Sequence, residues 1–388
     1  MKYRFPNDCG FSSEYLRKEN LSQYSVPTVP AGWTVGKSTF AAFLIFGLAL
    51  HADRSAAQTV DSVYEAYPSA LQLLADAPTR QQRVGNRYWA GRGHSEAVRE
   101  NASRDSHIHG SGIWLRADIG LGTADPDRSS TQAEYDIDTY EAQMGVDGVL
   151  WRGEQGAIIG GLTAQYATAE TDVSSSLRSD DITTSAYGIG ATLTYYGASG
   201  FYADVQGRYT WLDSNLGSSS QARRVRDNDA KAYVLSLELG HRVPISESLS
   251  LTPQGQLQFS RVNFETFVGP DGERVVNDAN DHALIGRFGL SLDSQRSWIR
   301  QNGKVDRYHL YGIANLYHDF LSGTRIDVDR RTLVSNVGDW TGELGLGGSY
   351  SWSDGLVTVF GEVSFATSLD DIGDSTRNGV VAGVRIGW

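Results

Sequence analysis

Histidines beside other ligands or acids are the features of this sequence most suited to catalysis or metal binding. They form three short clusters, His107 with His109, Asp281 with His282, and His318 with Asp319. Two histidines can ligate a metal ion, and a carboxylate beside a histidine can activate water. No third ligand follows at a fixed spacing, and polar side chains in loops need no catalytic explanation. We therefore predict no catalytic residue, no cofactor and no metal site.

Three arginines, Arg80, Arg83 and Arg87, recur at helical spacing before the first predicted strand, so they line one face of a helix. Residues 62–65 and 79–82 both have the capping-box form that begins a helix. Pro68 and Pro78 divide the region into short pieces. The spacing alone favours the interpretation that this basic face is a solvated surface.

From Ser111 onward, apolar and polar residues alternate with a period of two, which is typical of strands with one apolar face. In residues 201–211, Phe201, Val205 and Trp211 alternate with Asp204 and Arg208. The same split places Glu141, Asp147, Lys231, Glu238, Arg242 and Glu362 on charged faces. In the last strand, Val380, Ala382, Val384, Ile386 and Trp388 share the apolar face, and Arg385 lies on the other.

Long polar connections alternate with tight ones along the chain. The long ones lie around 121–136, 170–181, 214–229, 266–281, 319–338 and 367–378, and the short ones at 152–156, 197–200, 244–248 and 353–355, with a longer one near 294–304. This alternation is typical of an outer-membrane barrel with short periplasmic turns and long extracellular loops. We therefore predict an all-β fold, a transmembrane up-and-down antiparallel β-barrel of about twelve strands.

Composition excludes other classes. No run after residue 90 is long and apolar enough for a spanning helix. The net charge of −12 argues against nucleic acid as a partner. At the N-terminus, the apolar run 38–50 and the small residues before Ala57 predict a signal peptide, the alternative being a buried core helix. The expected domains are 1–57, an N-terminal extension with the signal peptide, 58–110, a linker with a helix, and 111–388, the barrel.

Three features together resemble the translocator domain of the classical autotransporters of Gram-negative bacteria. They are the segment YEAYPSALQLLADAPTRQQRVGNRYW at 64–89, the alternating strands and the ending VAGVRIGW. The resemblance implies an outer-membrane location and an α-helix in the barrel lumen from about Val63 to Arg87. Arg80, Arg83 and Arg87 would then face lumenal acids, namely Glu141, Asp147, Glu238 and Glu362. Val384, Ile386 and Trp388 would form the terminal strand read by the barrel-assembly machinery.

The function that the resemblance implies is that of a translocator barrel, not an enzyme, which moves or anchors an N-terminal passenger at the cell surface. The alternative is a passive pore or surface-adhesion barrel. Expected partners are outer-membrane lipid, the barrel-assembly machinery and periplasmic chaperones, with a monomeric chain. Almost nothing lies between Ala57 and Tyr64, where family members carry a passenger. Some members cut themselves at a lumenal Asn pair; only Asn86 occurs here, so we expect no self-cleavage.

Overall fold

Twelve long antiparallel strands close into a barrel in the part of the chain that the structure describes. The structure, a computed structural model, describes residues 62–87, 110–175, 178–218, 224–270, 272–277, 282–321 and 323–388. The barrel strands are β1 (Gly112–Ala124), β3 (Glu134–Gly153), β4 (Gly156–Ser175), β5 (Arg178–Gly197), β6 (Phe201–Ser218), β7 (Arg224–His241), β9 (Leu249–Phe264), β12 (His282–Ile299), β13 (Val305–Asp319), β16 (Trp340–Trp352), β17 (Val357–Ser368) and β18 (Thr376–Gly387). Because β18 pairs with β1 and β9 with β12, the sheet has no open edge. The predicted fold class is confirmed.

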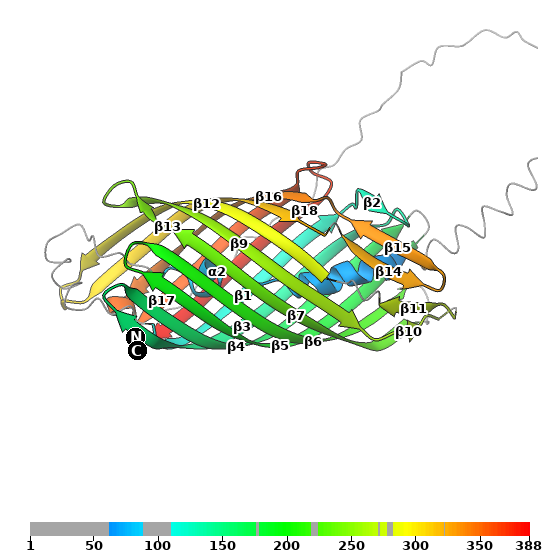
Figure 1. Ribbon diagram of the computed structural model, residues 1–388, viewed down its shortest axis with the longest axis horizontal. Helices are drawn as coiled ribbons and strands as arrows, with labels where there is room; N and C mark the ends of the chain where they lie inside the picture. Colours follow the sequence, from blue (N-terminus) through cyan, green and yellow to red (C-terminus); the bar gives the residue numbers. More distant parts are fainter. Residues whose placement is uncertain are drawn as a thin grey trace, which may run out of the picture. The chain divides into compact units, whose positions relative to one another are not determined.

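The two ends of the barrel differ (Figure 1). At one end the connections between strands are short. The one between β7 and β9 contains the short strand β8 (Val243–Pro244), and the one between β16 and β17 contains the 3₁₀ turn η1 (Ser353–Gly355). At the other end three connections pair into a second, five-stranded sheet in the order β10-β11-β14-β15-β2. Its strands are β2 (Arg128–Ser129), β10 (Phe267–Val268), β11 (Arg274–Asn277), β14 (Thr324–Val328) and β15 (Arg331–Asn336). Long loops mark the extracellular end of such barrels, so this second sheet, the cap sheet, lies outside.

Three predicted connections were wrong in extent. Residues 170–181 and 214–229 are mostly strand, because β4 continues to Ser175, β5 begins at Arg178, β6 continues to Ser218 and β7 begins at Arg224. The connection expected near 294–304 is only 300–304, since β12 runs to Ile299 and β13 begins at Val305. Their polar residues resemble a loop in composition, but most of them lie within strands, some on the outward face, such as Asp172, and some buried on the inward face, such as Asn228.

The polarity of the wall inverts along β3 to β9. Strands β3, β4 and β5 each have 20 residues, whereas a tilted membrane strand needs about 9–11. In the outer halves, buried polar side chains such as Thr171 and Ser214 are outnumbered by apolar ones. The apolar ones are Ile137, Ala167, Ala169, Val173, Ile182, Ala186, Leu212, Leu216, Ala230, Ala232, Val234, Val262 and Phe264. The exposed outward positions there include Asp136, Glu170, Asp172 and Asp229. In the outer part, the outward face is therefore polar and the inward face largely apolar, as in a water-soluble protein. In the inner part, the outward face is apolar, as in a membrane barrel.

Aromatic side chains mark the boundary between the two parts. Tyr166 and Tyr187 lie 5.0 Å apart between ring centroids, and Tyr209 lies 4.5 Å from Trp211 and 5.0 Å from Tyr233. Such rings collect where hydrocarbon meets headgroups. In contrast to the prediction from alternation, Lys231 shares the outward face with Tyr233, because both positions are odd-numbered and exposed on β7.

This boundary predicts a difference between two arginine substitutions on the outward face of β3. Met144 lies four residues inward of Tyr140, in the lipid-facing part, whereas Asp136 lies four residues outward of it. Met144→Arg should cost about 2–4 kcal/mol of folding free energy, and Asp136→Arg about 0–1 kcal/mol. Urea titration of folding into lipid vesicles measures both. Equal costs would contradict the placement of the boundary.

Candidate functional site

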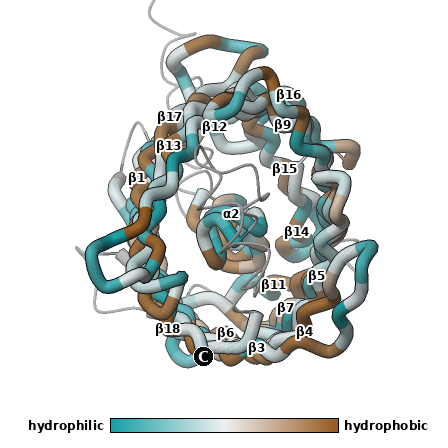
Figure 2. Tube along the Cα trace, turned by 90° about the vertical axis from the view of Figure 1, so that its left-hand side faces the viewer, coloured by the Kyte–Doolittle hydropathy of each residue, from teal (hydrophilic) through white to brown (hydrophobic). Residues whose placement is uncertain are grey.

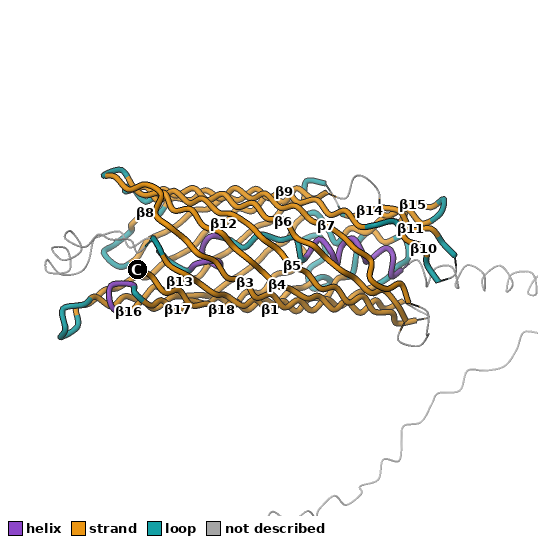
Figure 3. Tube along the Cα trace, turned by 90° about the horizontal axis from the view of Figure 1, so that it is seen from below, coloured by secondary structure: helices purple, strands orange, loops and turns teal. Residues whose placement is uncertain are grey.

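The lumen is occupied by residues 62–87, here called the inner segment (Figure 2, Figure 3). It forms a helix over 62–73, an irregular stretch and the short helix α2 (Arg80–Val84). The capping box predicted at α2 is present, since Thr79 and Gln82 exchange side-chain and backbone bonds. Pro68 does not divide the segment as predicted, whereas the stretch around Pro78 does. No helix among the described residues combines the length and the apolar character needed to cross a bilayer.

In the outer half of the barrel, the inner segment binds mainly through apolar contacts. Tyr67 and Leu71 are fully buried against the alanine-rich wall of β4 to β7. Small wall residues allow the helix to approach closely, and each large side chain so buried contributes about 1.5–3 kcal/mol. The Tyr67 ring lies 5.1 Å from that of Phe264, and its hydroxyl donates to Asn228 Oδ1 at 2.8 Å. The period-two pattern of the strands indicates a charged lumen and does not reveal this apolar half.

In the inner half, Arg83 makes a buried bidentate ion pair with Asp204 of β6. Its Nη1 and Nη2 lie 3.2 and 2.6 Å from the two carboxylate oxygens. Both side chains are at most 3% exposed. Thr194 completes the group by donating to Asp204 Oδ2 at 2.5 Å. Asp204 was assigned to the charged face of its strand from the sequence, but it was not among the acids expected to meet the arginines.

Arg87 and Arg80 are held differently. Arg87 forms a buried ion pair with Asp147, one of the expected acids. The Arg80 guanidinium lies over the Tyr202 ring, with Cζ 4.4 Å from the centroid. This is cation–π geometry. Glu238 does not meet the Arg80 side chain in an ion pair; it accepts the Arg80 backbone N–H at 2.9 Å.

Two of the acids predicted to face the arginines bind other groups. Glu141 pairs with Arg116 of β1. Glu362 accepts hydrogen bonds from Gln82 Nε2 and from the Tyr311 hydroxyl, both at 2.6 Å. The inner segment therefore meets Glu362 through an amide, and the expected set of arginine–acid pairs holds only for Asp147.

Barrel side chains cap both helices of the inner segment. Arg208 donates to the carbonyl oxygens of Leu74 and Asp76, just after the first helix, and Arg385 donates to that of Val84 at the end of α2. Glu238 accepts from the first N–H of α2. Cations at the C-terminal ends and an anion at an N-terminal end match the helix dipole. The sequence places all three side chains inward but does not show that they bind backbone.

At the extracellular mouth, Glu65 ties the inner segment to the connection between β1 and β3. Its Oε1 accepts from Ser129 Oγ at 2.6 Å. The same hydroxyl accepts the backbone N–H groups of Thr131 and Ala133, so Ser129 organises the turn. Glu65 is 1% exposed, and burial raises the pKa of its carboxyl above the usual 4.5.

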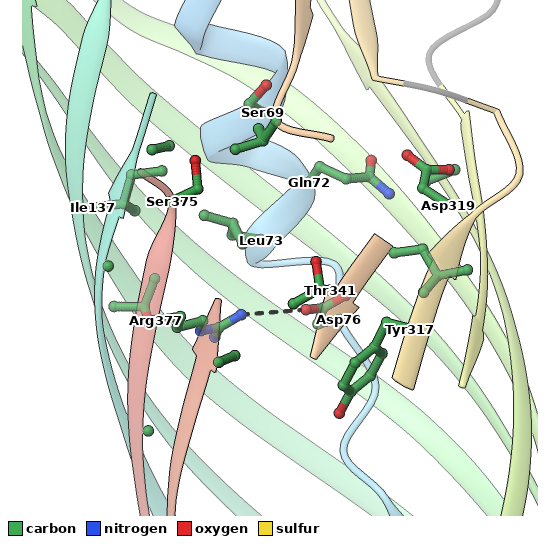
Figure 4. Close-up of a pocket in the computed structure, with 18 of the residues that line it drawn as sticks. Ser69, Gln72, Leu73, Asp76, Ile137, Tyr317, Asp319, Thr341, Ser375 and Arg377 are labelled. Carbon is green, nitrogen blue, oxygen red and sulfur yellow. Dashed lines mark ion pairs between the residues drawn. The ribbon is translucent and has the colours of Figure 1, made fainter. Parts of the chain in front are cut away.

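Beside the first helix, on the side away from the alanine-rich wall, lies a cavity of about 480 Å³ (Figure 4). Its lining includes Pro68, Gln72 and Leu73 of the inner segment and Tyr317 of β13. An ion pair of 3.6 Å between Asp76 and Arg377 crosses it. The helix therefore fills one side of the outer lumen, and the other side remains open.

The remaining predicted positions have structural roles or lie outside the described residues. His318 stacks on Trp340 at 4.2 Å, and Asp319 accepts the backbone N–H groups of Leu321 and Gly323. Among the described residues no group of three ligands could hold a metal ion. His107, His109, Asp281 and the signal peptide lie outside them. On β18, Ile386 is exposed on the outward face and Val384 is half-exposed, and Trp388, just after the strand, is exposed.

Reversing the charge of Arg83 should loosen the inner segment. In Arg83→Glu, two carboxylates would meet in a dry site, and breaking such a pair costs about 3–5 kcal/mol. We expect higher conductance in planar bilayers and faster proteolysis near Val84. The swap of Arg83→Glu with Asp204→Arg should restore both, and Arg325→Glu on exposed β14 should change neither. Unchanged conductance in Arg83→Glu would mean that this pair does not hold the plug.

Glu65 should make the mouth less stable as pH rises. The folded state holds its proton more tightly than the unfolded chain, so the free energy of unfolding falls from about pH 4.5 upward through the raised pKa. Glu65→Gln removes this loss. Urea unfolding at a series of pH values, compared between the parent and the variant, should show a difference that grows with pH. A constant difference would show that Glu65 titrates alike in both states.

Comparison with known proteins agrees with this architecture. Residues 113–364 match the family model described as autotransporter beta-domain. The adhesin BmaC autotransporter of Brucella suis is 39% identical over 327 residues, which is 84% of this chain and 10% of the length of that relative. The transport unit of AIDA-I from Escherichia coli matches with a TM-score of 0.57 and 16% identity, covering 78% of this chain and 100% of that one.

The beta domain of the Bordetella autotransporter BrkA matches with a TM-score of 0.54 and 20% identity, covering 72% of this chain and 99% of that one. At these identities the two structures show the fold alone, whereas the family model covers more than half of the chain. The closed barrel, the occupied lumen and the family match together place this protein in the outer membrane. The chain belongs to the autotransporter beta-domain family, the outer-membrane translocator barrels.

Proposed function

We propose that this barrel delivers an N-terminal passenger to the cell surface and then anchors it there through the inner segment. The observation that carries the proposal is the direction of the chain in the lumen. The helix over 62–73 contacts the outer mouth through Glu65, whereas Arg87 contacts Gly110 just before β1. The N-terminal end of the inner segment therefore lies at the extracellular mouth, the position that a surface-anchored passenger requires.

The tight fit of the inner segment supports anchoring over free conduction. The gap between α2 and Glu362 has no room for a water molecule, and a second gap, beside Ala77, has a volume of about 10 Å³, too small for a water file. The buried pairs of Arg83 and Arg87 fix the segment in register. These contacts favour a plugged barrel over the passive pore.

The lumen supports a role without catalysis. Its carboxylates bind arginines, hydroxyls, amides or backbone, as in Asp204 with Arg83 and Glu362 with Tyr311. An active site instead needs groups that converge on space for a substrate. We propose that the protein is not an enzyme, and that any adhesive activity belongs to the passenger.

Assembly partners are also part of the proposal. Ile386 and Trp388 keep the apolar face of β18 outward to its end. This supports recognition of the terminal strand by the barrel-assembly machinery, after escort by periplasmic chaperones. The closed sheet leaves no barrel edge for pairing with a second copy, which supports a monomer in outer-membrane lipid.

An epitope inserted before residue 62 tests the function. On intact cells, antibody should reach the epitope in the full chain. Deletion of 62–87 should abolish access and raise single-channel conductance, because it removes the segment that crosses and fills the lumen. A shift in gel migration on heating serves as the control that both barrels fold. An epitope that stays protected in the full chain would overturn the proposal.

A further inference from the structure

The cavity beside the first helix contains a notch in its wall between β16 and β18. Glu343 of β16 lies opposite Ala366 of β17, and Ala366 lies opposite Arg377 of β18. Since neighbouring strands are about 4.8 Å apart, the backbones that carry the acid and the arginine are about 10 Å apart, and only a methyl group lies between them. All three residues line the cavity, and Leu73 of the inner segment lines it as well.

The Glu343 carboxylate is oriented through one of its two oxygens. Asn315 Nδ2 donates to Oε1 at 2.7 Å, and the Tyr317 hydroxyl donates to the same oxygen at 3.0 Å. In the part of the chain that the structure describes, no donor meets Oε2. Glu343 is half-buried and lines the cavity. Its second oxygen is therefore available to a ligand in the cavity.

The two arginines nearest to Glu343 along the wall are held by other groups. Arg377 leans toward β1, since a Cβ at Gly120 would lie 3.2 Å from its Nη2, and it pairs with Asp76 of the inner segment at 3.6 Å (Figure 4). Arg287 of β12 donates to Asn315 Oδ1 at 2.9 Å. Neither arginine forms an ion pair with Glu343, so the carboxylate keeps an unneutralised charge.

The rest of the lining favours a cation with an apolar body. The lining contains six carboxylate side chains but only three arginines, a net charge of −3. It also contains apolar side chains, among them Leu73, Ile285 and Ala366. A cavity of about 480 Å³ with apolar walls and a few oriented polar groups has the form of a small-molecule site. An anion would be repelled, and an uncharged apolar molecule would leave the Glu343 oxygen without a donor.

We propose that this cavity binds an alkylammonium group, which donates to Glu343 Oε2 while its alkyl chain lies in the notch against Ala366 and Leu73. Hydrogen bonds between an ammonium group and a carboxylate are among the strong ones. A guanidinium prefers two carboxylate oxygens at once, whereas a compact ammonium group needs only one. The group can belong to a free amine or to a lysine side chain of a polypeptide.

Isothermal titration calorimetry of the full chain in a zwitterionic detergent can measure the binding. The probes are pentylamine, the uncharged pentanol, the oppositely charged pentanoate, and Nα-acetyl-lysine amide, which carries an alkylammonium group on a peptide unit. Glu343→Gln removes the charge but keeps an oxygen for Asn315 and Tyr317, and it should weaken pentylamine binding about tenfold. The control is Glu170→Gln, which removes an exposed acid from the outward face of β4. Heat-dependent gel migration checks the folding of each variant.

Arg377→Gln tests the site in the opposite direction. The Arg377 guanidinium is part of the same cavity and repels a bound cation. Its removal should therefore strengthen pentylamine binding about threefold, the size expected for a half-exposed charge. A purely structural role of Glu343 would not produce this gain.

Support for the site requires tighter binding of pentylamine than of pentanol and pentanoate, the loss in Glu343→Gln, the gain in Arg377→Gln and unchanged binding in Glu170→Gln. Tighter binding of pentylamine than of Nα-acetyl-lysine amide would identify a free amine as the ligand, and the reverse order a polypeptide side chain. Equal binding of pentylamine by the parent and Glu343→Gln would overturn the proposal. So would pentanol binding as tight as that of pentylamine, or an equal loss in Glu170→Gln.

Discussion

The pairing of β18 with β1 is the interaction on which the rest of this structure depends. A bilayer offers no partner for backbone N–H and C=O groups, so a spanning sheet is stable only when it closes. Closure fixes a lumen of defined width, and it brings Arg385 of β18 to the Val84 carbonyl oxygen of the inner segment. The terminal strand thus contributes to the lipid surface through Ile386 and to the plug through Arg385, on its two faces.

A closed wall that extends past the membrane is surrounded by lipid along one part of its length and by water along the other. Within the bilayer, the outward face is apolar and the lumen holds charges, which need partners because they are buried beside α2. Beyond the aromatic boundary, the outward face is polar and the wall encloses an apolar core. The inner segment follows the same division, with Tyr67 and Leu71 in the outer half and Arg83 and Arg87 in the inner half. A uniformly charged segment would bury unpaired charges in the outer half. A uniformly apolar segment would leave the buried acids of the inner half without cations.

The sequence predicts the barrel well because the period-two pattern and the turns are local properties. It predicts pairing inside the lumen poorly. Alternation tells which face of the strand Asp204 and Glu141 occupy. It does not tell their depth along the barrel axis or which part of the wall they lie on, because both depend on strand tilt and stagger. Arg83 therefore meets Asp204, whereas Glu141 meets Arg116. Pro68 was expected to divide the helix, but the helix over 62–73 runs through it, and only the carbonyl group four residues before it loses its helical donor.

The helices of the inner segment owe their stability to the barrel. A helix of five residues such as α2 is unstable alone, because nucleation costs more than its few hydrogen bonds return. Here Glu238 binds its first N–H, Arg385 binds the last carbonyl group, and Arg208 binds the carbonyl groups after the first helix. These three side chains come from β7, β18 and β6, so they converge only in the closed barrel. The short helix α2 is therefore stable only where the closed barrel supplies these caps.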